Sequence, residues 1–262
     1  MYDHYTRLRF ARRGSILTIT MDNPPLNAAD RVLHDELSRV FDAVAADPQC
    51  EVLVLTGEGR AFSAGGDFHG MLQALQSPAG LARAAEHAPH LLRSVLALDK
   101  PTIARVNGHA MGLGATLALL CDVVIAAEGA RIADAHVNVG LAAGDGGALI
   151  WPHLVGYARA RHHLLTGEAL VATEAARIGL IHKAVPLEEL DAEVYAYAER
   201  LAQGATQAIR ATKRAINMAL CAQAVAAADA HIGLELLTMS SDDHREAITA
   251  LLEKRAPVFR GR

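Results

Sequence analysis

The chain has 262 residues, of which 52% are hydrophobic, and its formal net charge is −4 at neutral pH. This length and composition exclude a wholly disordered chain and allow one large core with an appendage, or two modest domains. Lysine and arginine are scattered rather than banded, which argues against a nucleic-acid partner or an anionic-membrane surface.

The sequence shows no segment typical of secretion or membrane insertion. The N-terminal residues Met1 to Arg7 lack an apolar h-region, and no apolar run is expected to span a bilayer. The three cysteines, Cys50, Cys121 and Cys221, are odd in number and widely separated, as expected of reduced thiols. We therefore expect a soluble cytoplasmic protein with no membrane partner.

The first two thirds of the chain alternate between strands and helices. The hydrophobic pattern predicts strands at 15–21, 52–56, 102–106 and 123–126, and helices at 33–44, 81–98, 115–120 and 158–165. This rhythm suits a spiral of small strand-strand-helix units more than a doubly wound sheet, although periodicity alone does not separate the two.

From Pro186 the pattern becomes helical. The predicted helices cover 187–202, 206–219 and 222–240, and a last helix begins at a capping box over 243–246 and ends near Ala256. We therefore divide the chain into an α/β core, residues 1–200, and a C-terminal helical region, residues 201–262.

Two glycine-rich turns are the most informative feature of the sequence. Residues 60–68 follow the strand at 52–56, and residues 107–116 follow the strand at 102–106. Small residues let the backbone approach a ligand closely, and a strand-to-helix turn leaves amide hydrogens without intrahelical partners. Two such turns can converge on one negatively charged oxygen.

With these turns, the chain resembles the crotonase superfamily, the enoyl-CoA hydratases and isomerases. The matching segments run in family order along essentially the whole chain: 61–68, 106–113, 121–122, 139–141, 144–147, 151–152, 165–167, 175–180 and 253–255. The resemblance implies an α/β fold, a spiral of repeated β-β-α units, whose C-terminal helices assemble homotrimers or homohexamers.

The resemblance also implies an oxyanion hole for the thioester of an acyl-CoA. Its donors would be the backbone N–H groups of Ala64 and Leu113. The family usually has glycine at the second position, but the contribution comes from the backbone. Losing one such donor typically costs roughly 3–4 kcal/mol of transition-state stabilisation.

The resemblance places further residues around the substrate. Arg60 would lie near the CoA nucleotide, and Lys254 and Phe259 would reach the ligand from the same or an adjacent subunit. Phe68, Met71 and Leu72 would line an acyl tunnel. The other residues assigned to substrate binding are His34, Ala61, Ser63, Gly65, Gly66, Asp67, Gly112, Gly114 and Thr116. Ser63 does not lie in a nucleophile elbow, so we interpret it as structural.

Typical hydratases of this family have two glutamates where this chain has Thr116 and His136. A threonine hydroxyl cannot act as a general base near neutral pH, so hydration by paired carboxylates is not expected to transfer. Asp145 lies on a glycine-flanked turn and can either enter a cleft or close the turn. We predict that Asp145 moves a proton and that His136 assists or orients it, which favours isomerase or lyase chemistry.

Two alternatives remain at this point. His34, His136 and Asp145 together resemble a branch of the family that cleaves carbon–carbon bonds in β-diketones, although that branch departs from the oxyanion turns kept here. The other alternative is a catalytically weak binding or scaffold protein. We expect no cofactor beyond the CoA of the substrate. We expect no metal site either, because the 13 histidines form no His-Glu-x-x-His and the cysteines no Cys-x-x-Cys.

Overall fold

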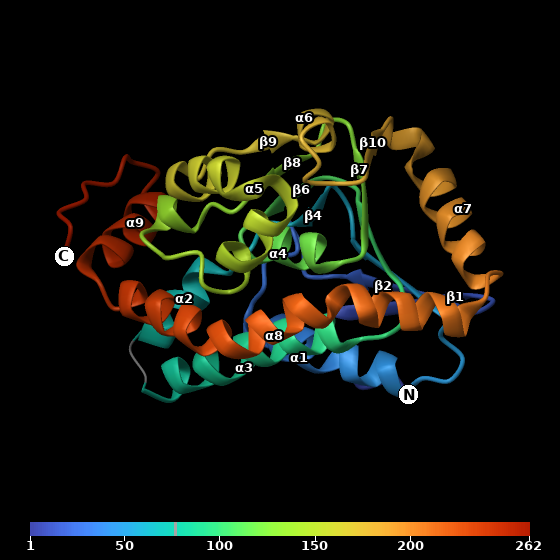
Figure 1. The fold of residues 1–262 in the computed structure, drawn as a ribbon. Coiled ribbons are helices and arrows are strands. Elements are labelled where there is room, and N and C mark those ends of the chain that lie inside the picture. The colour runs from blue at the N-terminus through green and yellow to red at the C-terminus, as the bar shows by residue number, and fades with distance from the viewer. Residues whose placement is uncertain (76–77) are drawn as a thin grey trace.

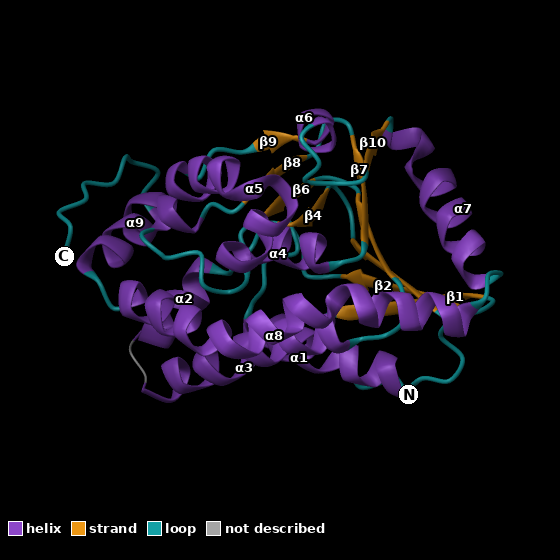
Figure 2. Cartoon of the chain, in the orientation of Figure 1, coloured by secondary structure: helices purple, strands orange, loops and turns teal. Residues whose placement is uncertain are grey.

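The computed structural model describes residues 1–75 and 78–262. It contains two sheets flanked by helices (Figures 1 and 2). The larger sheet has the strand order β1-β2-β3-β5-β7-β10, and the smaller sheet has the order β4-β6-β8-β9. The strands are β1 (Leu8–Arg13), β2 (Ile16–Met21), β3 (Val52–Gly57), β4 (Ala61–Ser63), β5 (Thr102–Val106), β6 (His109–Met111), β7 (Val123–Ala127), β8 (Arg131–Ala133), β9 (Leu170–Val171) and β10 (Lys183–Val185).

The helices follow these strands in a repeating order. They are α1 (Arg31–Ala46), α2 (Phe68–Leu75), α3 (Pro78–Ala97), α4 (Leu113–Leu120), the 3-10 turn η1 (His136–Val139), α5 (Gly147–Thr166), α6 (Ala172–Arg177), the 3-10 turn η2 (Leu187–Glu189), α7 (Leu190–Ala202), α8 (Thr206–Met239) and α9 (Asp242–Leu252). The pairs β3/β4, β5/β6 and β7/β8 each place one strand in each sheet, and helical structure follows each pair. The expected spiral of β-β-α units is therefore confirmed.

The centre of the larger sheet is buried on both faces. All six residues of β3 are buried, which is usual for a central strand in a parallel arrangement. Leu53 and Leu55 pack into the core cluster that includes α1 and α3. Val52 and Val54 face the opposite way and pack with α7 through residues such as Val194. Helix α7 therefore covers the second face of the sheet and belongs to the core.

Several sequence predictions for the fold were incomplete. Strand β1 was not predicted, because three of its six residues are charged and all three lie exposed at the sheet edge. Helix α2 was not predicted either. Helix α8 is continuous over 34 residues, whereas the sequence predicted two helices with a break at Leu220 and Cys221. Both of these residues keep their backbone N–H, so neither interrupts the helical hydrogen bonds. The last helix begins at Asp242, where Ser241 is the N-cap and accepts a hydrogen bond from the His244 amide at 3.1 Å.

Helix α8 also corrects the expectation about membrane-spanning segments. By length and composition alone it is long and apolar enough to cross a membrane. In the folded chain it lies along α3 (Figure 1), and Asp229 accepts an ion-pair contact from Arg93 at 3.3 Å. Its buried Lys213 binds Asp122 at 2.7 Å. These contacts make α8 a packed helix of the domain.

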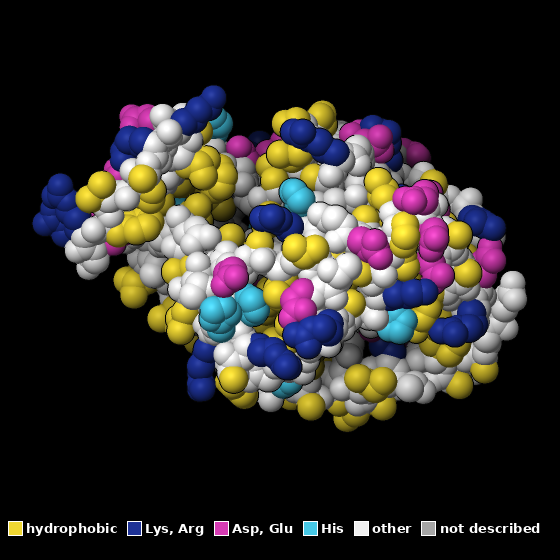
Figure 3. Space-filling view, turned by 90° about the horizontal axis from the view of Figure 1, so that it is seen from above, with side chains coloured by type: hydrophobic (Ala, Val, Ile, Leu, Met, Phe, Trp, Pro, Cys, Tyr) yellow, Lys and Arg dark blue, Asp and Glu magenta, His cyan; other side chains and the backbone are white. Residues whose placement is uncertain are grey.

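One face of the molecule, seen from above the view of Figure 1, carries charges of both signs. Figure 3 shows basic, acidic and apolar side chains interspersed across this face. The distribution matches the scattered charge of the sequence, and the low net charge of −4 gives the chain little long-range attraction for polyanions.

Candidate active site

A cavity of about 420 Å³ lies between the sheets and the C-terminal helices. Its walls come from α1, α2 and the turn that precedes it, the middle of α3, the start of α4, the segment around His136 and Asp145, and the C-terminal half of α8. Elements distant in the sequence therefore meet at one concave surface, which is the usual setting of a small-molecule site.

The two glycine-rich turns lie against each other at this cavity. Gly65 has φ +89°, and a Cβ built there would lie 2.8 Å from the carbonyl oxygen of Met111. Gly112 has φ +50°, and its Cβ would lie 3.9 Å from the Cα of Gly65. A side chain at Gly65 would therefore force the turns apart, whereas at Gly112 the positive φ is what favours glycine. The predicted convergence of the two turns is thus present.

One of the two predicted donors is wrong. The Ala64 N–H donates to the carbonyl oxygen of Leu26 at 2.9 Å, so it is not available to a ligand. Two residues later, Gly66 bridges Ala29 in parallel fashion. The neighbours of Gly66 make the hydrogen bonds to Ala29, and successive amides of an extended segment point to opposite sides. The Gly66 N–H therefore points away from Ala29, and it has no hydrogen-bond partner among residues 1–75 and 78–262.

The second predicted donor is well placed. Leu113 is the first residue of α4, with Gly112 as the N-cap, so its N–H has no acceptor within the helix. Both Leu113 and Gly66 line the cavity. The positive end of the α4 dipole also points to this region. A pair of backbone donors, Gly66 and Leu113, can therefore serve one anionic oxygen.

His136 is buried between two carboxylates. Its Nδ1 lies 2.5 Å from Oδ1 of Asp134, and its Nε2 lies 3.4 Å from Oδ2 of Asp145. Burial alone would lower the pKa of His136, but the charges of Asp145 and Asp134 and their hydrogen bonds raise it well above its usual value. The imidazole is therefore positively charged at neutral pH and joins the two acids.

Asp145 is held by side chains rather than by its own turn. Its Oδ1 accepts a hydrogen bond from the Thr116 hydroxyl at 3.0 Å, and its Oδ2 faces His136. Burial would raise the pKa of Asp145, but the His136 charge and the hydrogen bonds from His136 and Thr116 hold it below its ordinary value. Asp145 is thus an anionic proton acceptor that lines the cavity.

Glu235 is a site residue that the sequence analysis missed. It lies on α8, lines the cavity, and has a buried Oε2 with no partner within the described part of the chain. Burial, followed by the charge of Asp145, raises the pKa of Glu235 from 4.5 to about 8. At neutral pH the site therefore pairs a protonated acid, Glu235, with a carboxylate, Asp145. The sequence signal that could have indicated Glu235 is a single glutamate in an apolar stretch of helix.

Comparison with known proteins identifies the family of the chain. The family model described as enoyl-CoA hydratase/isomerase matches residues 11–262. The chain belongs to the enoyl-CoA hydratase/isomerase family. It is 37% identical over 260 residues to a probable enoyl-CoA hydratase of Rhodobacter capsulatus, and the alignment covers 98% of this chain and 99% of that relative. The predicted membership of the crotonase superfamily is confirmed.

Solved structures of the family superpose on most of the chain. An enoyl-CoA hydratase/isomerase from Mycobacterium paratuberculosis has a TM-score of 0.91 at 34% identity, and covers 95% of this chain and 99% of its own. A β-diketone hydrolase from the cyanobacterium Anabaena, bound to (S)-3-oxocyclohexyl acetic acid, has a TM-score of 0.85 at 28% identity, and covers 91% and 96%.

Some of the substrate-binding residues predicted from the enoyl-CoA hydratase/isomerase family lie at the cavity. His34 lines it from α1, and burial and the neighbouring His87 lower the pKa of His34. Asp67 lines it too, and its Oδ2 accepts a hydrogen bond from the Gly70 amide at 2.8 Å at the start of α2. Met71 is the residue of the predicted acyl tunnel that lines the wall.

Other predicted residues have supporting positions. The Ser63 hydroxyl donates to the Asn27 carbonyl at 2.7 Å, in agreement with a structural role. Gly114 lies against Ser63, where a Cβ would come within 2.7 Å of the serine Cβ. Ala61 lies in β4 and its carbonyl accepts a hydrogen bond from Asn27 at 2.9 Å. Phe68 begins α2. These residues fix the shape of the first glycine turn.

The residues predicted to bind CoA lie elsewhere. Arg60 lines a separate cavity of about 500 Å³ together with Arg105 and Asn107. Lys254 and Phe259 are exposed in the segment that follows α9, and Phe259 is 47% exposed. Their assignment to CoA stays a prediction.

Proposed function

We propose that the protein converts an acyl-CoA thioester through an enolate, in an isomerase-type or lyase-type reaction. The observation that carries this proposal is one cavity that holds two backbone donors, Gly66 and Leu113, with no acceptor in the described part of the chain, beside the carboxylate of Asp145 and the neutral acid Glu235. CoA would enter as part of the substrate.

The chemistry follows from these groups. The thioester oxygen accepts hydrogen bonds from the Gly66 and Leu113 amides, which strengthen as negative charge develops on it. The Asp145 carboxylate removes a proton from a carbon next to the thioester or conjugated with it, and the electron pair moves onto that oxygen. The positive charge of His136 keeps Asp145 ionised before this step.

The enolate can then collapse in two ways. Asp145 can return the same proton to another carbon, which moves a double bond without net change in composition. Alternatively, the enolate expels a group from the β-carbon, and Glu235 supplies the proton that this leaving group requires. Direct hydration by two glutamates is not part of the proposal, because Thr116 and His136 occupy those positions.

Proton exchange tests the proposal directly. The purified protein is incubated in deuterated water with a panel of acyl-CoAs, and deuterium uptake at the α-carbon is followed by mass spectrometry. Exchange is expected for the wild type and for Asp191→Asn, whose side chain is 68% exposed and pairs with Arg105. Asp145→Asn should abolish it. Equal exchange by Asp145→Asn and the wild type would contradict the role of Asp145.

A second candidate is the hydrolysis of a carbon–carbon bond in a β-diketone. It is favoured by the imidazole of His136 between Asp134 and Asp145, and by the likeness to the Anabaena β-diketone hydrolase. Water would add to one carbonyl carbon as the His136–Asp145 pair takes its proton. The bond between that carbon and the central carbon would then break, leaving a carboxylic acid and an enolate that is protonated to a ketone.

The two candidates differ in their products. Hydrolase chemistry predicts a carboxylic acid from a cyclic β-diketone, detectable by chromatography, and no deuterium uptake into acyl-CoA. A scaffold protein would show neither activity.

We also propose that copies of the chain associate through the C-terminal region, as trimers or hexamers in the cytoplasm. Ile216, Met218 and Leu237 of α8 are 70–72% exposed in the single chain, which is unusual for large apolar residues gathered on one helix. The cysteines are free thiols, as a reducing compartment requires. Light scattering coupled to size exclusion gives the oligomeric state, and a monomer would contradict this assignment.

A further inference from the structure

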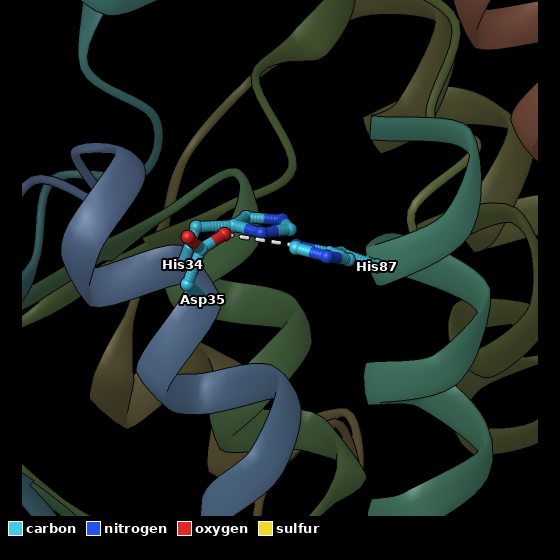
Figure 4. Close-up of side chains that lie close together, drawn as sticks. All are labelled: His34, Asp35 and His87. Atoms are coloured by element: carbon cyan, nitrogen blue, oxygen red, sulfur yellow. Dashed lines mark ion pairs between the residues drawn. The ribbon is translucent and has the colours of Figure 1, made fainter. Parts of the chain in front are cut away.

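Three potential metal ligands meet at the rim of the cavity. His34 and Asp35 extend from α1, and His87 extends toward them from α3 (Figure 4). The Nδ1 of His87 lies 2.9 Å from Oδ1 of Asp35. The two imidazole rings are nearly parallel, with an interplanar angle of 15° and centroids 6.2 Å apart. One ligand atom from each of the three side chains lies within 4.8 Å of the other two.

His34 distinguishes this cluster from an ordinary ion pair. Burial and the neighbouring His87 lower the pKa of His34, so its ring is neutral at physiological pH and keeps a lone pair. The side-chain contacts of residues 1–75 and 78–262 include ring nitrogens of His87, His90 and His136, but neither ring nitrogen of His34. An imidazole with a free lone pair therefore lies beside a histidine–aspartate pair at the wall of the cavity.

We propose that His34, Asp35 and His87 bind a divalent transition-metal ion, with Zn²⁺ as the best match. Zn²⁺ takes imidazole nitrogen and carboxylate oxygen at about 2.0–2.2 Å, which places tetrahedral ligands about 3.3 Å apart. The cluster departs from this spacing: Nδ1 of His87 and Oδ1 of Asp35 are 2.9 Å apart, and the three ligand atoms lie within 4.8 Å of one another, so the side chains must rotate to share one ion. Three protein ligands leave a fourth position for water on the cavity side.

The donor set also selects the class of metal. Two imidazoles and one carboxylate suit Zn²⁺, Ni²⁺ or Co²⁺, whereas Mg²⁺ and Ca²⁺ require oxygen ligands. This site stands whether or not the proposed reaction is right, since none of the three residues is assigned a step in it.

Two other groups in the chain serve as internal comparisons. His90 and Asp42 form a 2.9 Å pair on the same two helices, but their side chains are 48% and 60% exposed, and they belong to no three-ligand cluster among the described residues. His136 also lies between carboxylates, but both of its ring nitrogens already face them. An ion there would have to displace a buried proton network.

Metal binding by the full chain tests the proposal. The protein, free of any histidine tag, is stripped with a chelator, dialysed, and titrated with Zn²⁺ in competition with a chromophoric chelator. One Zn²⁺ per chain is expected, with no competition from millimolar Mg²⁺. Since loss of a supporting residue alone costs roughly 10–100-fold in metal affinity, His34→Ala and His87→Ala should each weaken binding by at least about 100-fold. His90→Ala should bind like the wild type.

The controls keep the result interpretable. Thermal unfolding of the metal-free variants shows whether they fold, and Asp35→Asn, which keeps the shape of the side chain, replaces any alanine variant that does not. Its binding should also weaken. Absence of stoichiometric Zn²⁺ binding, binding that survives both His34→Ala and His87→Ala, or binding lost only in His136→Asn would each overturn the proposal.

Discussion

Replacing Glu235 by glutamine should change how stability depends on pH. Burial raises the pKa of this carboxyl from 4.5 to about 8, so between these pH values the folded protein holds one proton that the unfolded chain has released. The unfolding free energy must then fall as pH rises through this window, and level off above pH 8. Glutamine has the same shape and no proton to lose, so the variant lacks this contribution.

The expected size follows from the pKa shift. One proton difference changes the unfolding free energy by about 1.4 kcal/mol for each pH unit. Relative to the wild type, Glu235→Gln should therefore gain roughly 3 kcal/mol between pH 5 and pH 7. The assay is urea unfolding at several pH values and one protein concentration, because association of copies would otherwise contribute.

Asp229→Asn is the matched control for this experiment. Asp229 is the other acidic residue of α8, and its side chain is 80% exposed beside Arg93. Its variant should follow the pH dependence of the wild type. A parallel pH dependence in Glu235→Gln and wild type would refute the assignment of Glu235 as a buried neutral acid.

Three further variants test the groups around His136. Thr116→Val removes the hydroxyl that donates to Asp145, so the pKa of Asp145 should rise and the acidic limb of the pH–rate profile should move to higher pH. Asp134→Asn removes one of the charges that raise the pKa of His136, so that pKa should fall, as followed by NMR of the imidazole carbons. Gly147→Ala would place a Cβ 1.6 Å from Oδ2 of Asp134, so both the activity and the midpoint temperature of thermal unfolding should fall. An unchanged midpoint in a thermal scan would show that the backbone moves to accommodate the methyl group.

The sequence predicted the central fold because its signals are local. The strand at 52–56 is a continuous apolar run, as expected for a parallel strand buried on both faces, and the helical spacing in 33–44 reflects one buried face of α1. Strand β1 escaped detection because an edge strand buries little, and charged residues are common there. Only its pairing with β2 reveals it.

The site was predictable only in part. His136 was recognised because it stands where the family has a glutamate, and Asp145 because it lies in the matched segment 144–147; their side chains do meet. The choice between Ala64 and Gly66 depends on a hydrogen bond to Leu26, a contact across 38 residues that carries no sequence pattern. Glu235 arrives from α8, a helix that the sequence assigned to association alone. Long-range packing therefore decides which groups face the cavity.

The central claim is that two backbone amides hold the enolate oxygen, and one pair of variants at Leu113 tests it most directly. Proline suits the first position of a helix and has no N–H, so Leu113→Pro removes the donor from a position that accepts the ring. Leu113→Ala loses side-chain packing but keeps the donor. The measurement is the rate of α-proton exchange of a bound acyl-CoA, with unfolding of both variants as the control for folding.

Leu113→Pro is expected to exchange at least about 100-fold more slowly than Leu113→Ala. Equal exchange rates in two folded variants would contradict the claim.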